Sequence, residues 1–155
     1  MILWPDGFVD ALVSRGLRVL RFDNRDIGKS TWLDHLGVPP LSRMTAKAMM
    51  GVRVSAPYTL WDMAKDTVGL LDGLGLPKAH VVGASMGGMI AQCMAIRHPT
   101  RLCSLTSIMS TTGSRRLFRP RRRAMAALLG PRPTDRASTQ DYFVQFARAM
   151  AGQGF

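Results

Sequence analysis

The chain has 155 residues, a length that fits one ordinary domain with a single hydrophobic core. It is 46% apolar, with no low-complexity tract and no apolar run long enough to span a bilayer, which predicts a soluble globular protein and no membrane partner. The formal net charge is +11, from 21 lysines and arginines against ten aspartates, so anionic partners must be considered.

The positive charge is concentrated in one segment. Eight arginines lie between Arg115 and Arg136, opposed only by Asp135, so this segment supplies +7 of the net +11. Basic clusters can bind phosphate backbones or anionic membranes, but this one has no interleaved aromatic residues and no signature of a nucleic-acid-binding fold. We therefore expect a solvated arginine-rich surface, or one paired with acidic groups from elsewhere, and no nucleic-acid partner. Binding of anionic polymers is the alternative.

The two cysteines, Cys93 and Cys103, fall in segments predicted to be a buried helix and a strand. We expect packed free thiols rather than a disulfide. The first residues have no basic region and no cleavage site of a secretory signal. Both observations favour a cytoplasmic protein. No Cys/His cluster has the spacing of metal ligands, and we expect neither a metal nor a cofactor.

The first part of the chain predicts one helix, one strand and an irregular stretch. Phe8 to Arg15 has the apolar spacing of a helix, which Gly16 is placed to close. Leu17–Phe22 is a short, strand-like run. Asp, Asn and Gly residues supply turn chemistry from Asp23 to Thr31, and residues 32–58 are irregular and interrupted by prolines.

The middle of the chain alternates helices and strands. Thr59 is placed to cap a helix that Gly75 ends. Its expected apolar face consists of Leu60, Met63, Ala64, Thr67, Val68, Leu71 and Leu74. A strand over 79–84 follows, then a helix from Met86 to Arg97 that is apolar on nearly every side and should be buried, then a strand over 102–108. This alternation argues for an α/β fold in which all three strands run parallel, with helical crossovers on the sheet faces.

The most specific motif is Gly-x-Ser-x-Gly at residues 83–87, because an apolar strand precedes it and a helical pattern follows. In this context the pentapeptide indicates a nucleophile elbow, a tight turn that presents serine in a strained backbone conformation. Side chains larger than those of Gly83 and Gly87 would collide in such a turn. We expect Ser85 to be the catalytic nucleophile and the N–H of Met86 to stabilise an oxyanion. An ordinary tight βα turn is the structural alternative.

Four segments carry a resemblance to a known family: Trp4-Pro5-Asp6, Arg21 to Thr31, Tyr58-Thr59-Leu60 and Val81 to Gly88. They resemble the α/β-hydrolase superfamily, closest to the aclacinomycin methylesterase-like serine hydrolases. The resemblance implies a partial α/β-hydrolase fold, a parallel sheet with flanking helices. It also implies a serine carboxylic-ester hydrolase that forms an acyl-enzyme on Ser85.

The resemblance further implies a domain organisation and a substrate class. Residues 1–114 match the hydrolase core, and residues 115–155 resemble the start of a helical lid. Within that lid, Ser138-x-x-Asp141 signals a helix with an apolar face at Tyr142–Met150. This face would line a pocket for a small hydrophobic ester or pack as core. The same holds for the methionines of the irregular stretch, Met44, Met49 and Met50.

In this family the catalytic acid and histidine follow the nucleophile in the order Ser, Asp, His. Here no histidine follows His98, and only Asp135 and Asp141 follow the last predicted strand, both in lid-like sequence. The family's oxyanion loop and first strands would lie before Met1. The chain therefore looks truncated at both ends, and we expect it to be inactive as given. A non-catalytic remnant with a binding role is the other interpretation.

The three histidines are expected to be structural. His35 lies in the irregular stretch, where we expect exposure. His80 begins the strand at the end opposite to Ser85. His98 ends the following helix, about 18 Å from Ser85 at about 1.5 Å per residue.

Overall fold

The chain divides into two compact units, Met1–Ser110 and Thr111–Phe155. The computed structural model describes residues 4–37, 44, 47, 50, 52, 54–114, 135, 138, 139, 141, 142, 144, 145 and 148. All eight arginines of the segment from Arg115 to Arg136 lie outside these residues, as does Met49. The boundary expected near residue 114 and the lid role of the second unit stay predictions.

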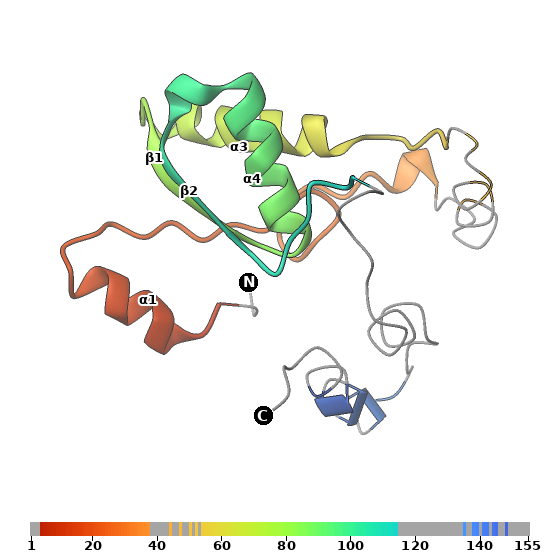
Figure 1. Ribbon diagram of the computed structural model, residues 1–155, viewed down its shortest axis with the longest axis horizontal. Coiled ribbons are helices and arrows are strands. Elements are labelled where there is room, and N and C mark those ends of the chain that lie inside the picture. The colour runs from red at the N-terminus through yellow and green to blue at the C-terminus, as the bar shows by residue number, and fades with distance from the viewer. Residues whose placement is uncertain are drawn as a thin grey trace. The chain divides into compact units, whose positions relative to one another are not determined.

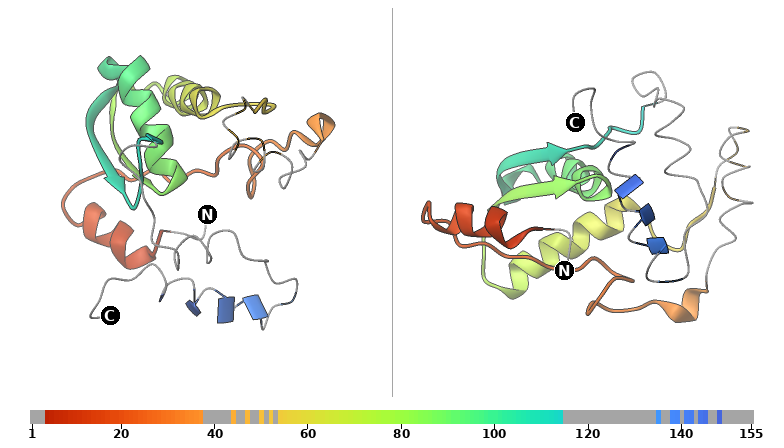
Figure 2. Two further views of the ribbon diagram at one scale, coloured as in Figure 1. Left: turned by 45° about the vertical axis from the view of Figure 1, so that its right-hand side comes forward. Right: turned by 90° about the horizontal axis from the view of Figure 1, so that it is seen from below.

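The first unit is built around two parallel strands, β1 (Ala79–Ala84) and β2 (Leu102–Ile108) (Figure 1). Between them the chain forms α4 (Met86–Arg97) and the short 3₁₀ helix η2 (Pro99–Arg101). Helix α4 packs against both strands and against α3 (Leu60–Gly73), as two further views show (Figure 2). The parallel strands and their helical crossover agree with the predicted α/β class.

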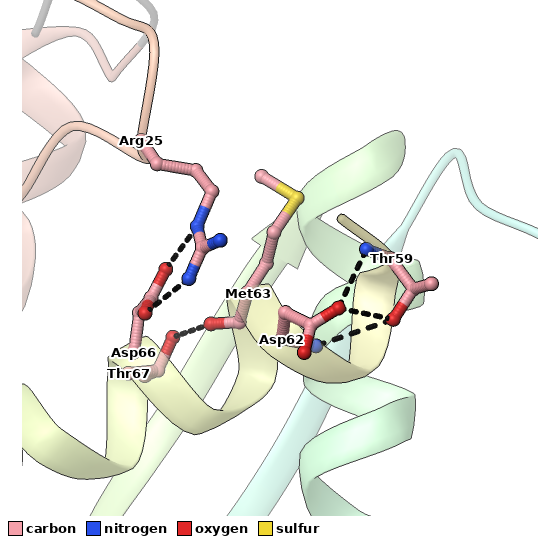
Figure 3. Close-up of polar contacts among 6 residues, drawn as sticks. All are labelled: Arg25, Thr59, Asp62, Met63, Asp66 and Thr67. Atoms are coloured by element: carbon pink, nitrogen blue, oxygen red, sulfur yellow. Dashed lines mark hydrogen bonds and ion pairs between the residues drawn. The ribbon is translucent and has the colours of Figure 1, made fainter. Parts of the chain in front are cut away.

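Helix α3 begins with a capping box, which Figure 3 shows. The Thr59 hydroxyl accepts a hydrogen bond from the Asp62 N–H, and the Asp62 carboxylate accepts one of 2.7 Å from the Thr59 N–H. These bonds satisfy donors that the first turn leaves open. The predicted cap is therefore confirmed, and the helix ends before Gly75, whose φ is +65°. The buried face of α3 consists of Met63, Ala64, Thr67, Val68 and Leu71.

The hydrophobic core lies between α3 and α4. Its buried members are Met63, Ala64, Val68, Leu71, Ile90 and Met94. Helix α4 has the predicted bounds, and its residues Gly88, Ile90, Ala91 and Met94 are buried. The expectation of a buried helix is therefore confirmed for the middle of α4, whereas Met86 and Ile96, toward its two ends, are 41% and 71% exposed.

The segment before the loop at 23–31 differs from its prediction. Helix α1 (Asp6–Val13) forms and Gly16 closes it with φ +80°, but residues 17–22 are not a strand. A strand is defined by ladder hydrogen bonds to a neighbour, and among the described residues β1 pairs with β2 alone. The prediction of a third parallel strand over 17–22 was therefore wrong. Arg21 instead ties this segment to α1 through a 3.0 Å ion pair with Asp6.

Two smaller expectations also need correction. Cys93 is half-buried, and this burial raises the pKa of its thiol, whereas Cys103 is exposed rather than packed. In the second unit the described residues between 138 and 148 are helical. The Ser138 N–H donates a 2.9 Å bond to the Asp135 carboxylate, so the cap lies at Asp135 and not at Ser138. In the described part of the chain no helix is long and apolar enough to cross a membrane.

Candidate active site

Ser85 occupies the turn between β1 and α4, with φ +53° and ψ −120°. A non-glycine residue in this region costs about 1–3 kcal/mol and persists only where its surroundings hold it there. The hydrogen bonds around Ser85 supply that restraint. Its N–H donates to the Ile108 carbonyl over 2.8 Å, and its carbonyl accepts from the Gly88 N–H and the Met89 N–H at 3.0 and 3.3 Å.

Close packing at the elbow explains one of the two expected glycines. A Cβ added to Gly83 would lie 2.2 Å from the carbonyl oxygen of Gly87, far inside contact distance. A Cβ added to Gly87 would meet nothing within 4 Å. The steric reason expected for Gly87 was therefore wrong. The backbone of Gly87 limits the size of residue 83, but a side chain at position 87 would itself meet no obstacle.

Gly88 is the second glycine that the packing requires. A Cβ there would lie 2.6 Å from the Cβ of Ser110 and 2.7 Å from the hydroxyl of Ser107. Helix α4 can thus approach the end of β2 only with glycine at this position. The pair of adjacent glycines was visible in the sequence, but the role of Gly88 depends on residues that are distant in the chain.

The first turn of α4 gives the site its electrostatic character. Met86 is the first residue of the helix, and within the described residues its N–H has no hydrogen-bond acceptor. Such open N–H groups carry the positive end of the helix dipole and favour an anion nearby. Ser85 directly precedes these groups, so the oxyanion that forms on a carbonyl group attacked by its hydroxyl would have a donor nearby.

No histidine joins Ser85 by a hydrogen bond in the described part of the chain. His80 Nδ1 lies 2.8 Å from the Ser104 hydroxyl. The His98 N–H donates to the Met94 carbonyl at the end of α4. His35 is exposed in η1 (Asp34–Leu36), as expected. The described residues likewise contain no group of three His, Cys or acidic side chains that would hold a metal ion.

A cavity of about 460 Å³ lies away from the elbow, between the loop at 22–33 and the Asp66 and Leu70 side chains of α3. Arg25 spans it with two 2.6 Å hydrogen bonds to Asp66, drawn in Figure 3. These bonds raise the pKa of Arg25. The Arg25–Asp66 ion pair forms part of the cavity wall, and no residue of the elbow lines the cavity. We therefore do not assign the reaction to this cavity.

Asp26 lies in the same loop, and its own backbone is strained, with φ +61°. Its carboxylate accepts a 2.6 Å bond from the Leu33 N–H and a second bond from the Tyr58 hydroxyl. The Leu33 bond is the larger cause of a lowered pKa at Asp26, and the bond to Asp26 raises the pKa of Tyr58. Asp26 therefore serves as an anchor of the loop.

The alpha/beta hydrolase fold family matches residues 3–143 of the chain. The match covers most of the sequence, so the chain belongs to this family, and the resemblance seen in the sequence is confirmed. The fold and the elbow agree with this class, since a parallel strand delivers the serine to a helix N-terminus.

The chain is similar to two methylesterases. Rhodomycin D methylesterase DnrP of Streptomyces peucetius is 37% identical over 103 residues, which are 66% of this chain and 28% of that protein. Rhodomycin D methylesterase DauP of Streptomyces sp. (strain C5) is 35% identical with the same coverage. The putative carbamate hydrolase RutD of Caulobacter segnis is 36% identical over 58% of this chain and 27% of its own. The chain thus spans less than a third of the length of these relatives.

Proposed function

We propose that this chain carries the nucleophile and one oxyanion donor of a serine carboxylic-ester hydrolase. The observation that supports this most strongly is the strained Ser85 between β1 and α4, with the Met86 N–H at the helix start. The relatives named methylesterases support an ester of a small alcohol as substrate. The partner is then a small hydrophobic ester, not a nucleic acid or a membrane, and the reaction takes place in the cytoplasm.

The proposed reaction has two stages. The Ser85 hydroxyl loses its proton to a histidine and its oxygen forms a bond to the ester carbonyl carbon, which moves one electron pair onto the carbonyl oxygen. The Met86 N–H stabilises that oxyanion until the carbon–oxygen bond to the alcohol breaks and the alcohol leaves with a proton. Water then attacks the acyl-enzyme and releases the acid. The elbow needs no metal and no cofactor for these steps.

We infer that the acid and the base of this reaction lie outside the described part of the chain. None of the three histidines bonds to Ser85, so we propose that the 155-residue chain alone does not turn over. The relatives' greater length leaves room for both groups outside the matched region.

The test is ester hydrolysis by the protein as its gene encodes it. Methyl esters of aromatic acids should be hydrolysed, and Ser85→Ala should abolish turnover. Ser104→Ala is the control, because its hydroxyl contacts His80 at the far end of β2 and should leave the rate unchanged. Hydrolysis that survives Ser85→Ala would overturn the proposal. Faster turnover of a carbamate than of any ester would correct the substrate class.

A further inference from the structure

The backbone of Ser85 is held at both ends by the residues that close β2. Its N–H donates to the Ile108 carbonyl over 2.8 Å, and its carbonyl accepts a 2.9 Å bond from the Ser110 hydroxyl. Between these two contacts lies Met109, with φ +48° and 72% of its side chain exposed. A strained residue whose side chain is in solvent gains little from its own packing. Its conformation turns the chain so that Ser110 lies against the elbow.

The Ser85 carbonyl and the Met86 N–H belong to one peptide unit. This unit is planar and trans, so the carbonyl and the N–H point in opposite directions and rotate together. A hydrogen bond that holds the carbonyl therefore also fixes the direction of the N–H. The other two donors to this carbonyl, the Gly88 and Met89 N–H groups, move with α4 itself. Ser110, two residues beyond β2, is the donor from outside α4.

The packing around Ser110 supports a specific contact. A Cβ on Gly88 would lie 2.7 Å from the Ser110 hydroxyl oxygen as well as 2.6 Å from its Cβ, so any larger residue at position 88 would displace this side chain. Ser107 lies against the same glycine, but its hydroxyl accepts a 3.1 Å bond from the Gln92 side chain instead. The two serines thus share a neighbour and differ in their hydrogen-bond partner.

We propose that Ser110 is a positioning residue of the reaction: through the Ser85 carbonyl, its hydroxyl sets the direction of the Met86 N–H toward the oxyanion. The inference rests on the proposed function for its catalytic consequence. Ser110 acts on the peptide unit and not on the reacting atoms. The hydroxyl therefore affects the transition state, where negative charge develops, more than it affects substrate binding.

Kinetics of Ser110→Ala in the gene-encoded protein test this role. Loss of an oxyanion donor costs about 10²–10³ in kcat, and a misdirected donor should cost roughly tenfold with KM nearly unchanged. Ser110→Thr keeps a hydroxyl and should restore most of the rate. Ser107→Ala is the matched control and should leave kcat near that of the parent. Equal losses of kcat in Ser107→Ala and Ser110→Ala would show that the effect comes from packing alone and would overturn the proposal.

A second measurement separates this inference from the proposed function. In protein labelled with ¹⁵N-methionine, the Met86 amide signal reports hydrogen bonding to the carbonyl of its own peptide unit, and Met86→Leu identifies that signal. Ser110→Ala should move it, whereas Ser110→Thr and Ser107→Ala should leave it near the parent position. An unmoved signal in Ser110→Ala overturns the inference even if the enzyme is active. A parent protein without Ser85-dependent turnover overturns the proposed function, and the amide shift still decides how Ser110 acts.

Discussion

The N–H of Ser85 donates a hydrogen bond to the carbonyl of Ile108, the last residue of β2, over 2.8 Å. In the parallel register Ala84 pairs with Ile108, and this bond, donated by the residue that follows β1, is part of that pairing. The strained residue is thus held by the sheet as well as by the helix that follows. The placement of the Ser85 hydroxyl therefore depends on β2.

Alanine at Gly83 or Gly88 should destabilise the protein by about 3 kcal/mol, because each added Cβ meets atoms within 2.7 Å that belong to the elbow or to the end of β2. Urea unfolding of each variant measures the loss. Gly87→Ala is the control within the same motif: its Cβ meets nothing within 4 Å and lies in a helix, so we expect a gain of about 0.5–1 kcal/mol. A larger loss at Gly87 than at Gly83 would contradict the packing described for the elbow.

The capping box of α3 makes stability depend on pH. The Thr59 hydroxyl, and then the Thr59 N–H, hold the pKa of Asp62 below its ordinary value. A lowered folded pKa stabilises the protein fully above the unfolded value of about 3.9, and that contribution is lost as the pH falls through the folded pKa. The stability difference between the parent and Asp62→Asn should therefore be present at about pH 7 and shrink toward about pH 3.

Asp10, exposed on α1, provides the matched control for that comparison. Asp10→Asn likewise replaces a helical carboxylate by an amide and is measured beside Asp62→Asn. Thr59→Ala should cost about 1 kcal/mol at neutral pH through loss of the cap. A constant Asp62→Asn effect at every pH would show that the carboxylate does not stabilise the helix start.

The 155-residue chain alone should show no hydrolysis of a short-chain nitrophenyl ester that depends on Ser85. Loss of the base in a serine hydrolase costs on the order of 10⁶-fold in kcat. Within the described residues no histidine bonds to Ser85, so His80→Gln and His98→Gln should change nothing in this assay. If Ser85→Ala removes activity from the isolated chain, an unrecognised base is present and the account of the site must change.

The isolated chain is also expected to be marginally stable and to associate. In the described part of the chain the sheet has two strands, so each has one unpaired edge that can template pairing with another chain. Apolar side chains such as Ile96 are also exposed. Size-exclusion chromatography with light scattering and a thermal melt measure both properties. A monomer with a cooperative transition would refute this expectation.

Local sequence signals were sufficient for most of the first unit. Thr59, the apolar spacing of α3 and Gly83 act within about one turn of the residues that they control, so their effects can be derived without knowledge of distant contacts. The bounds of α4 and the turn at Ser85 follow from such signals. The coarse class, a parallel sheet with helical crossovers, follows from their alternation.

Relationships between distant residues could not be derived in this way. The run Leu17–Phe22 has strand-like composition, but a strand also needs a partner, and composition does not reveal whether one is present. The same holds for the Ser110 hydroxyl on the Ser85 carbonyl and for the Arg25 pair with Asp66. Each joins segments that only the folded chain brings together.

The most direct test of the central claim is to trap the acyl group on Ser85. The gene-encoded protein is mixed with an activated ester, quenched in acid and digested with trypsin, which releases Ala79–Arg97 as one peptide. Ser85 is the only hydroxyl side chain in that peptide, and Cys93 is its only thiol. We predict one acyl mass on Ser85 in the parent and none in Ser85→Ala. Turnover of the ester with Ser85 unmodified, or with the acyl group on Cys93, would contradict the assignment of the nucleophile.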